Sequence, residues 1–227
     1  MQIALDTSTE IASLALVQGS EILSELTWRC GQNHTIELYP RLDMLLTKAN
    51  LDIKSADCIF VAKGPGSFNG LRVGVAAAKG LAFSLGIPII GISTLESMAY
   101  QQASSGLPVC AVQNAGREEI AVAVYQLKKR KGWCQLAAEQ LTTVEALPKI
   151  IKNTVVFCGE INSVTAAQIK KIFKTKAVVP GPAAQLRRAA YLAELGQRCI
   201  AAGTYDNLAT LQPLYLRRPP ITERKKA

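Results

Sequence analysis

A glycine-rich stretch between an expected strand and an expected helix is the part of this sequence best suited to bind a ligand. Residues 63–72, KGPGSFNGLR, hold three glycines and a proline within seven positions, which permits a tight turn with unusual backbone angles. The helix expected at 71–85 begins there with free N–H groups, which suit an anion or a capping hydroxyl. Two interpretations stay open: a phosphate cradle at Gly64, Gly66 and Ser67, or a strand-to-helix turn capped from within the chain. A leucine rather than a lysine follows the last glycine, so this is not a P-loop.

The remaining candidates for chemistry are one carboxylate and one imidazole. Asp6, followed by Thr7 and Ser8 at the end of the first expected strand, suits either a water-mediated metal–nucleotide contact or an Asx turn. The matching position in the second half is Gln113, so no second carboxylate faces Asp6 to help hold Mg²⁺ for phosphoryl transfer. His34 is the single histidine, and a lone histidine at a helix start is more typical of capping or packing than of a metal ligand. We therefore expect no catalytic residue and no metal site.

Composition is typical of a folded protein. Of 227 residues, 49% are hydrophobic and 19% are charged, which favours a globular chain of one large or two small domains. No two of the six cysteines have CxxC spacing, so we expect reduced core thiols in a reducing compartment. The N-terminus lacks a basic signal region, and the longest apolar region, 73–92, is interrupted by lysine, glycine and proline. We expect a cytoplasmic protein with no membrane span.

The excess of positive charge lies entirely in the second half of the chain. Residues 1–113 hold seven Lys or Arg and nine Asp or Glu, whereas residues 114–227 hold nineteen and eight. The densest run of cations is Lys128, Lys129, Arg130 and Lys131. Such a basic surface either contacts nucleic acid or an acidic partner, or is simply solvated.

Periodicity and turn residues predict an alternating α/β chain. The first half is expected to hold an antiparallel meander followed by alternating helices and strands. These elements are expected at residues 2–5, 11–17, 21–28, 36–49, 57–62, 71–85, 88–92 and 94–102.

Two helices of this half carry more apolar surface than contact with one sheet requires. Helix 36–49 has a widened apolar stripe, and helix 71–85 contains only two charged residues. A helix that is apolar nearly all round is either buried on all sides or meets a partner. We expect an interface here, and we expect Ala78→Glu to block association while the monomer stays folded. The residues expected in or beside the contact are Leu38, Leu42, Leu45, Val75, Ala78 and Ala82.

The second half repeats the pattern of the first. Residues 110–113 echo residues 3–6 and residues 119–124 echo residues 10–15, so the second connecting loop is expected to be two residues longer. Either an ancient duplication or chance similarity of two hairpins explains this. Further strands and helices are expected at 133–140, 144–151, 154–158, 163–173 and 176–179.

These elements divide the chain into two lobes and a tail. We expect a first lobe at 1–104, a second lobe at 105–217 and a basic tail at 218–227. The second lobe should end in one long helix at 182–202, placed to pack back on the first lobe, and then an apolar segment at 211–216.

Five segments together resemble one known family. They are DTST at 6–9, HT at 34–35, GPGSFNGLRVG at 64–74, AAKGLA at 77–82 and PLYLR at 213–217. In these the sequence is similar to the TsaB (YeaZ) family of bacterial tRNA threonylcarbamoyladenosine biosynthesis proteins. The resemblance covers nearly the whole chain. It implies a two-lobed α/β fold of the actin-like, sugar-kinase-like ATPase class (ASKHA, ribonuclease H-like) with duplicated mixed sheets.

The resemblance also implies a function. Members of this family are non-catalytic partners of TsaD, which carries paired metal-binding histidines and modifies the adenosine beside the anticodon in tRNAs that read codons beginning with A. The resemblance implies a heterodimer with TsaD, joined by the small ATPase TsaE, with tRNA bound through the complex and ATP used by the complex rather than held by this chain. It places the contact with TsaD, or a homodimer when the chain is alone, on the two first-lobe helices, and adds His34, Leu71 and Lys79 to the expected interface.

The sequence departs from the family pattern at two places. Asn69 stands where the family usually has threonine, and residues 113–117, QNAGR, stand where it usually has an Asp-Ala-Arg run. The second departure argues against nucleotide hydrolysis by this chain alone. The alternative function is an independent kinase-like, nucleotide-binding ATPase. The peptidase activity implied by the family's older name, glycoprotease, is not supported by a single histidine.

Overall fold

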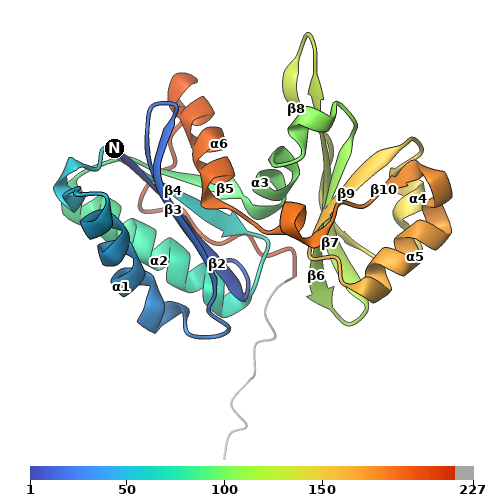
Figure 1. Ribbon diagram of the computed structural model, residues 1–227, viewed down its shortest axis with the longest axis horizontal. Helices are drawn as coiled ribbons and strands as arrows, with labels where there is room; N and C mark the ends of the chain where they lie inside the picture. Colours follow the sequence, from blue (N-terminus) through green and yellow to red (C-terminus); the bar gives the residue numbers. More distant parts are fainter. Residues whose placement is uncertain (218–227) are drawn as a thin grey trace, which may run out of the picture.

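Two five-stranded mixed sheets, one in each half of the chain, form the framework of the structure (Figure 1). The computed structural model describes residues 1–217, and the basic tail predicted at 218–227 lies outside the described residues. Each sheet is covered by helices on both faces. The arrangement confirms the predicted α/β class with duplicated lobes.

The first lobe begins with an antiparallel meander. Its strands are β1 (Gln2–Asp6), β2 (Ile11–Gln18), β3 (Glu21–Arg29), β4 (Cys58–Gly64) and β5 (Ile89–Ser93), in the spatial order β3-β2-β1-β4-β5. β4 runs parallel to both β1 and β5. The outer face of this sheet is covered by α1 (His34–Lys48) and α2 (Phe68–Leu85), with the short 3-10 helix η1 (Ile53–Ser55) between them in the chain.

The second lobe has the same topology. Its strands are β6 (Val109–Gly116), β7 (Glu119–Lys128), β8 (Gly132–Thr142), β9 (Val155–Gly159) and β10 (Ala177–Val178), in the order β10-β9-β6-β7-β8. Its outer face is covered by α4 (Leu147–Ile150) and α5 (Ser163–Phe173). Asp6 pairs with Ser13 across the first hairpin, and Gln113 pairs with Ala121 across the second. The second hairpin is therefore one residue longer between paired positions, not two as predicted. A bulge between Asn114 and Gly116 accommodates the extra residue.

Each inner sheet face is covered by a helix from the other half of the chain. The helix α3 (Thr94–Tyr100) packs on the second sheet through Leu95 and Met98. The helix α6 (Ala189–Ala201) packs on the first sheet, where a Cβ at Gly196 would lie 2.4 Å from the Phe60 ring. The two lobes are thus joined by exchanged helices (Figure 1).

The prediction of one long helix at 182–202 is wrong. The chain instead forms a short 3-10 turn, η4 (Pro182–Gln185), and an extended stretch at 186–188, and α6 begins only at Ala189. The interruption has a tertiary cause, because the two arginines of the extended stretch reach acidic groups of the first lobe. Arg187 pairs with Asp6 and Arg188 pairs with Glu25.

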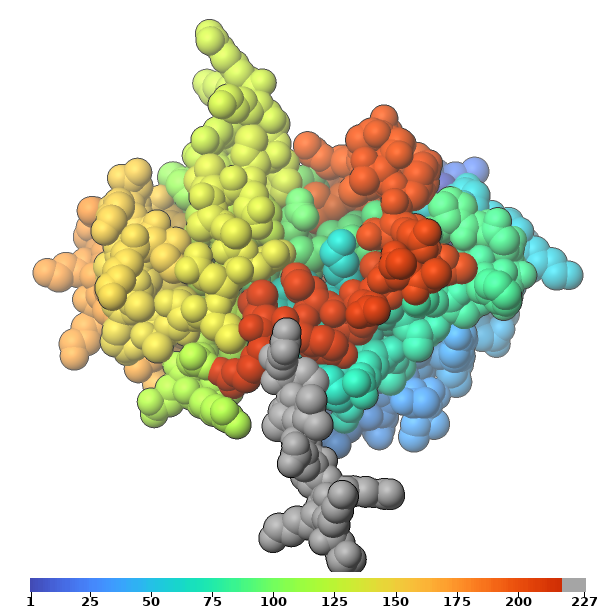
Figure 2. Space-filling model, turned by 180° about the vertical axis from the view of Figure 1, so that it is seen from behind, coloured from blue at the N-terminus to red at the C-terminus, as the bar shows by residue number. Residues whose placement is uncertain are grey.

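After α6 the chain crosses from the first lobe to the second (Figure 2). Asp206 bridges to Ile89 at the edge of β5, and Leu211 is buried in the first-lobe core. Further along, the Leu214 amide donates to Lys63 O at 2.6 Å, and Arg217 forms an ion pair with Glu119 of the second lobe. We call residues 206–217 the C-terminal strap. The apolar segment predicted at 211–216 is part of it and forms no strand.

The six cysteines form no disulfide bond in the structure. All six cysteines are free, and four of them are buried. Burial raises the pKa of the Cys58 thiol to about 12, so it stays protonated at neutral pH and behaves as a small apolar side chain.

Within residues 1–217 no helix is both long and apolar enough to cross a membrane.

Candidate functional site

The glycine turn between β4 and α2 packs directly against the loop that follows β1. The Ser67 amide donates to Ser8 O at 2.7 Å, and Thr7 Oγ1 donates to Gly70 O at 2.7 Å. Ser67 is the N-cap of α2, and its hydroxyl accepts a hydrogen bond from the Gly70 amide at 3.1 Å. Of the two interpretations of the glycine turn, the structure therefore shows the capped strand-to-helix turn.

The glycines of this turn allow two backbones to approach closely. A Cβ at Gly66 would lie 2.4 Å from Ser8 O, and a Cβ at Gly70 would lie 2.1 Å from Thr7 O. At Gly64, where φ is +116°, a Cβ would lie 2.6 Å from Leu214 O of the strap. The glycine turn therefore packs closely against the loop after β1 and against the strap.

This packing gives a direct stability prediction. We expect Gly70→Ala to destabilise the chain by about 2 kcal/mol or more, because its methyl group must displace the loop that contains Thr7. The matched control is Gly80→Ala on the same helix, where the added Cβ meets only the Tyr39 hydroxyl at 4.0 Å. This control should be stabilising by about 0.5–1 kcal/mol, because glycine is unfavourable inside a helix. Urea unfolding of both variants measures the difference, and equal effects would contradict the close-approach argument.

Asp6 is the last residue of β1, and both of its carboxylate oxygens contact groups of the same chain. Its Oδ1 accepts hydrogen bonds from the Ser8 amide at 2.9 Å and the Ser8 hydroxyl at 2.6 Å, which is the Asx-turn arrangement. Its Oδ2 lies 3.2 Å from Arg187 Nε, and both side chains are almost completely buried. At the position that could have served a metal–nucleotide complex, the carboxylate therefore faces a guanidinium of its own chain.

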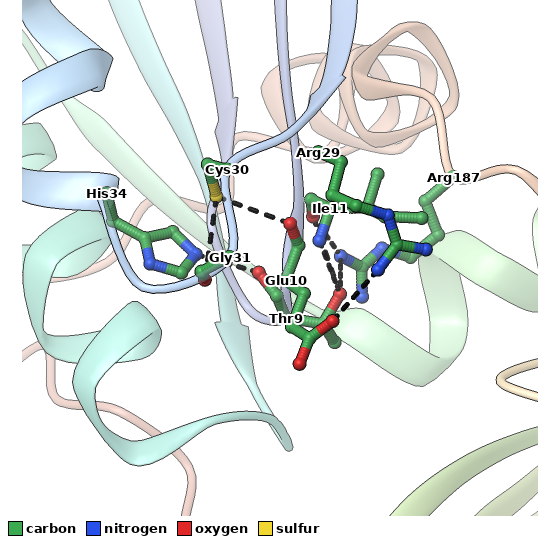
Figure 3. A network of polar contacts seen from close by, with 8 residues as sticks. All are labelled: Thr9, Glu10, Ile11, Arg29, Cys30, Gly31, His34 and Arg187. Atoms are coloured by element: carbon green, nitrogen blue, oxygen red, sulfur yellow. Dashed lines mark hydrogen bonds and ion pairs between the residues drawn. The ribbon is translucent and has the colours of Figure 1, made fainter.

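Arg187 holds the loop after β1 from the second half of the chain (Figure 3). Its Nη2 donates to Thr9 Oγ1 and to Ile11 O, each at 2.6 Å. The Glu160 carboxyl lies nearby after β9; desolvation raises its pKa, and the positive charge of Arg187 opposes that rise. Sequence reasoning missed Arg187, because its position read as the interior of a helix and no local pattern links it to Asp6.

His34 packs inside the first lobe at the start of α1. Its Nε2 lies 2.7 Å from Thr9 O, and since a carbonyl only accepts, Nε2 carries the proton (Figure 3). The ring is 4% exposed. The structure thus shows the packing role that is typical of a lone histidine, and it corrects the expectation that His34 lies in a partner interface. Within residues 1–217, no group of three or more His, Cys, Asp or Glu side chains could hold a metal ion.

Most of the predicted interface residues belong to the core of the first lobe instead. The apolar faces of α1 and α2 pack on their own sheet and on each other, so these side chains are not available to a partner. The corrected residues, each less than 5% exposed, are Leu38, Leu42, Leu45, Leu71, Val75, Ala78 and Ala82. Lys79 is partly exposed, and its Nζ donates to Ala209 O and Leu211 O of the strap, each at 3.2 Å.

The outward faces of the same helices still carry large apolar side chains. Ile36 is 72% exposed, Tyr39 is 48% exposed and Phe83 is 78% exposed. Ala76 is also exposed. We call these four residues the outer helix face. The exposed apolar side chains of these helices therefore lie on the side opposite to the residues that were predicted for the interface.

The basic run Lys128–Lys131 belongs to the second lobe, whereas Asp6 belongs to the first. It forms the turn between β7 and β8, in the hairpin that projects from the second lobe (Figure 1). All four side chains are exposed.

Comparison with known proteins identifies the family. A family model described as TsaD, tRNA N6-adenosine threonylcarbamoyltransferase, matches residues 28–223. The chain is 30% identical over 219 residues to the tRNA threonylcarbamoyladenosine biosynthesis protein TsaB of Bacillus subtilis, with 95% of this chain and 93% of that protein covered. The chain belongs to the TsaB family. A TsaB of Haemophilus influenzae is also 30% identical, over 226 residues, with 95% of this chain and 92% of that protein covered.

Solved structures show the same fold. YeaZ from Pseudomonas aeruginosa superimposes with a TM-score of 0.79 at 24% identity, over 94% of this chain and 99% of that one. The (R)-2-hydroxyglutaryl-CoA dehydratase component A of Acidaminococcus fermentans superimposes with a TM-score of 0.53 at 13% identity, over 88% and 98%. The TsaB-family resemblance and the ASKHA-like fold predicted from the sequence are both confirmed.

Proposed function

We propose that this chain is a non-catalytic subunit of the machinery that places threonylcarbamoyl on the adenosine beside the anticodon of tRNAs that read codons beginning with A. It acts as a heterodimer with TsaD, together with TsaE, and the complex rather than this chain uses ATP and performs the transfer. Membership of the TsaB family supports the pathway, because the curated relatives are biosynthesis proteins for this modification.

The ion pair between Asp6 and Arg187 is the observation that most directly supports the proposed non-catalytic role. A phosphoryl-transfer site needs carboxylates free to hold Mg²⁺ and charged groups that contact the phosphates. Here the carboxylate at the end of β1 is buried against a guanidinium 3.2 Å away, and the matching position of the second lobe is Gln113, which is buried and uncharged. The glycine turn also packs closely against the loop after β1. These contacts favour a rigid partner protein over an independent ATPase.

The outer helix face is our proposed contact for TsaD. Ile36, Tyr39, Ala76 and Phe83 place exposed apolar groups on two adjacent helices of the first lobe. Exposed large apolar side chains that gather on one face are typical of protein interaction sites. A self-dimer through the same face would compete with TsaD for it.

Reconstitution tests the proposed function. TsaD and TsaE from the same organism, tRNA, ATP and the threonylcarbamoyl donor are mixed with and without this chain, and modified adenosine is measured by mass spectrometry. We expect modification to require the chain, and we expect the chain alone to hydrolyse no ATP. Modification at the full rate without the chain would overturn the proposal, and steady ATP turnover by the isolated chain would favour the kinase-like alternative.

A further inference from the structure

The turn between β7 and β8 holds the longest run of consecutive cations in the described chain, at the end of a projecting hairpin (Figure 1). We propose that this turn, Lys128–Lys131, binds the sugar–phosphate backbone of tRNA outside the modified nucleotide. We call these four residues the basic finger. The inference rests on the proposed function, because tRNA is the substrate of the complex.

The finger is held by a rigid base. Residues 124–128 of β7 pair with residues of β8, ending in the pairs Leu127 with Trp133 and Lys128 with Gly132. The Trp133 ring stacks on Tyr125 with centroids 5.5 Å apart, and its Nε1 donates to Glu96 Oε1 of α3 at 3.2 Å. The cations at the turn are therefore carried on an ordered support, which lowers the entropy cost of placing them against a ligand.

The four cations have no acidic partner within residues 1–217. No ion pair of the described chain includes any of them, and all four are exposed. The acids of the two strands, Glu119 at the start of β7 and Glu139 in the second half of β8, lie away from the turn. Arg198 of α6 adds a fifth cation beside it, since its Nη2 lies 3.6 Å from the place of a Cβ at Gly132. Adjacent unpaired cations repel one another, so a polyanion that neutralises them is favoured.

The chemistry of the finger fits phosphate contact rather than base reading or membrane insertion. Residues 128–132 read KKRKG and contain neither an aromatic nor an aliphatic side chain. Sequence-specific RNA recognition uses stacking on aromatic groups, and interfacial membrane binding needs apolar side chains, whereas lysine and arginine contact phosphates without regard to sequence. The finger should therefore add affinity for any tRNA and no preference among tRNAs.

The finger also stays free when the proposed partner is bound. It belongs to the second lobe, whereas α1 and α2, which carry the outer helix face, cover the outer face of the first lobe (Figure 1). TsaD bound to those helices leaves the β7–β8 turn open to a second ligand. One chain can thus hold the enzyme with one lobe and the tRNA backbone with the other.

The test measures tRNA binding by the heterodimer with TsaD as a function of salt. One variant changes Lys128, Lys129, Arg130 and Lys131 to glutamine. The matched control changes Lys170, Lys171, Lys174 and Lys176, four cations in and just after α5 in the same lobe, to glutamine. We expect the finger variant to bind tRNA about tenfold or more weakly near 0.1 M salt, and the slope of log affinity against log salt to fall by about 0.7–0.9 for each phosphate that is no longer neutralised. The control should weaken binding much less.

Three results would overturn the inference: an unchanged slope, equally weakened binding by both variants, or a finger variant that fails to bind TsaD or TsaE rather than tRNA. Equal weakening would mean that overall charge, not the finger, attracts the RNA, and failure to bind a protein would mean that the finger is a protein contact. If the basic finger does not bind tRNA, the proposed function still holds provided that modification at saturating tRNA requires the chain. Modification that never requires the chain rejects the proposed function, whatever the finger binds.

Discussion

Replacing Arg187 with alanine is expected to lower the free energy of unfolding by about 3–5 kcal/mol. The change leaves the Asp6 carboxylate, which is 2% exposed, without the guanidinium 3.2 Å away. It also removes the two hydrogen bonds of 2.6 Å that tie the loop after β1 to the second half of the chain. A buried charge left without its partner costs its full desolvation free energy, which is why the expected effect is large. Urea unfolding followed by circular dichroism measures it.

The adjacent arginine is the matched control. Arg188 pairs with Glu25, but its side chain is 47% exposed, so Arg188→Ala should cost only about 0.2–1 kcal/mol. The double variant Asp6→Asn with Arg187→Ala should recover part of the stability, because the neutral amide no longer needs a counter-charge. Equal effects of the two arginine substitutions, or no recovery in the double variant, would contradict the assignment of Arg187 as the internal partner of Asp6.

Ala78→Glu is expected to prevent stable folding, in contrast to the expectation from the sequence that the monomer would survive. Ala78 is 0% exposed in the first-lobe core. A glutamate there forces extra volume into a packed site, which costs about 1–3 kcal/mol, and adds the cost of burying an unpaired charge, which is several kcal/mol more. Since a domain is stable by only about 5–15 kcal/mol, we expect little soluble folded protein. Soluble yield and thermal unfolding measure the effect.

Ala76→Glu is the same substitution two residues earlier, on the exposed side of α2. This variant should fold with nearly the stability of the unmodified chain, because its carboxylate stays in water. It should also weaken co-purification with TsaD by about tenfold or more, since a charge on the outer helix face must be stripped of its water when the partner binds. Unchanged co-purification would move the TsaD contact away from α2.

Contacts within the chain connect its two halves at the candidate site. Arg187 lies beside Asp6, and the loop after β1 packs on the glycine turn. The strap then crosses between the lobes, from Asp206 at β5 to Arg217 beside Glu119. Contacts made by the chain's own side chains therefore stabilise its ASKHA-like fold. This explains how the protein can present the outer helix face and the basic finger on a stable framework.

Local sequence patterns were sufficient to predict most of the elements and their repeat. Strand and helix positions came from local periodicity, and α5 begins and ends where the sequence predicted. The cap at Ser67 and the Asx turn at Asp6 were among the local alternatives, because both are made by residues within three positions of their partners. Such features depend only on residues that are close together in the sequence, so they can be predicted from the sequence alone.

The surfaces and the partners that these elements use could be established only from the assembled fold. Within α2 only Arg72 and Lys79 mark the exposed side, on which Ala76 also lies, and nearly every other residue of the helix is small or apolar. Local sequence therefore separates the buried side, with Ala78, from the exposed side only weakly. The partner of Asp6 stands 181 positions away, in a stretch whose composition favours helix, and that long-range pairing holds the stretch extended instead. Burial and charge pairing between distant segments outweigh local propensity by several kcal/mol, so they set the role of each residue only once the two lobes are assembled.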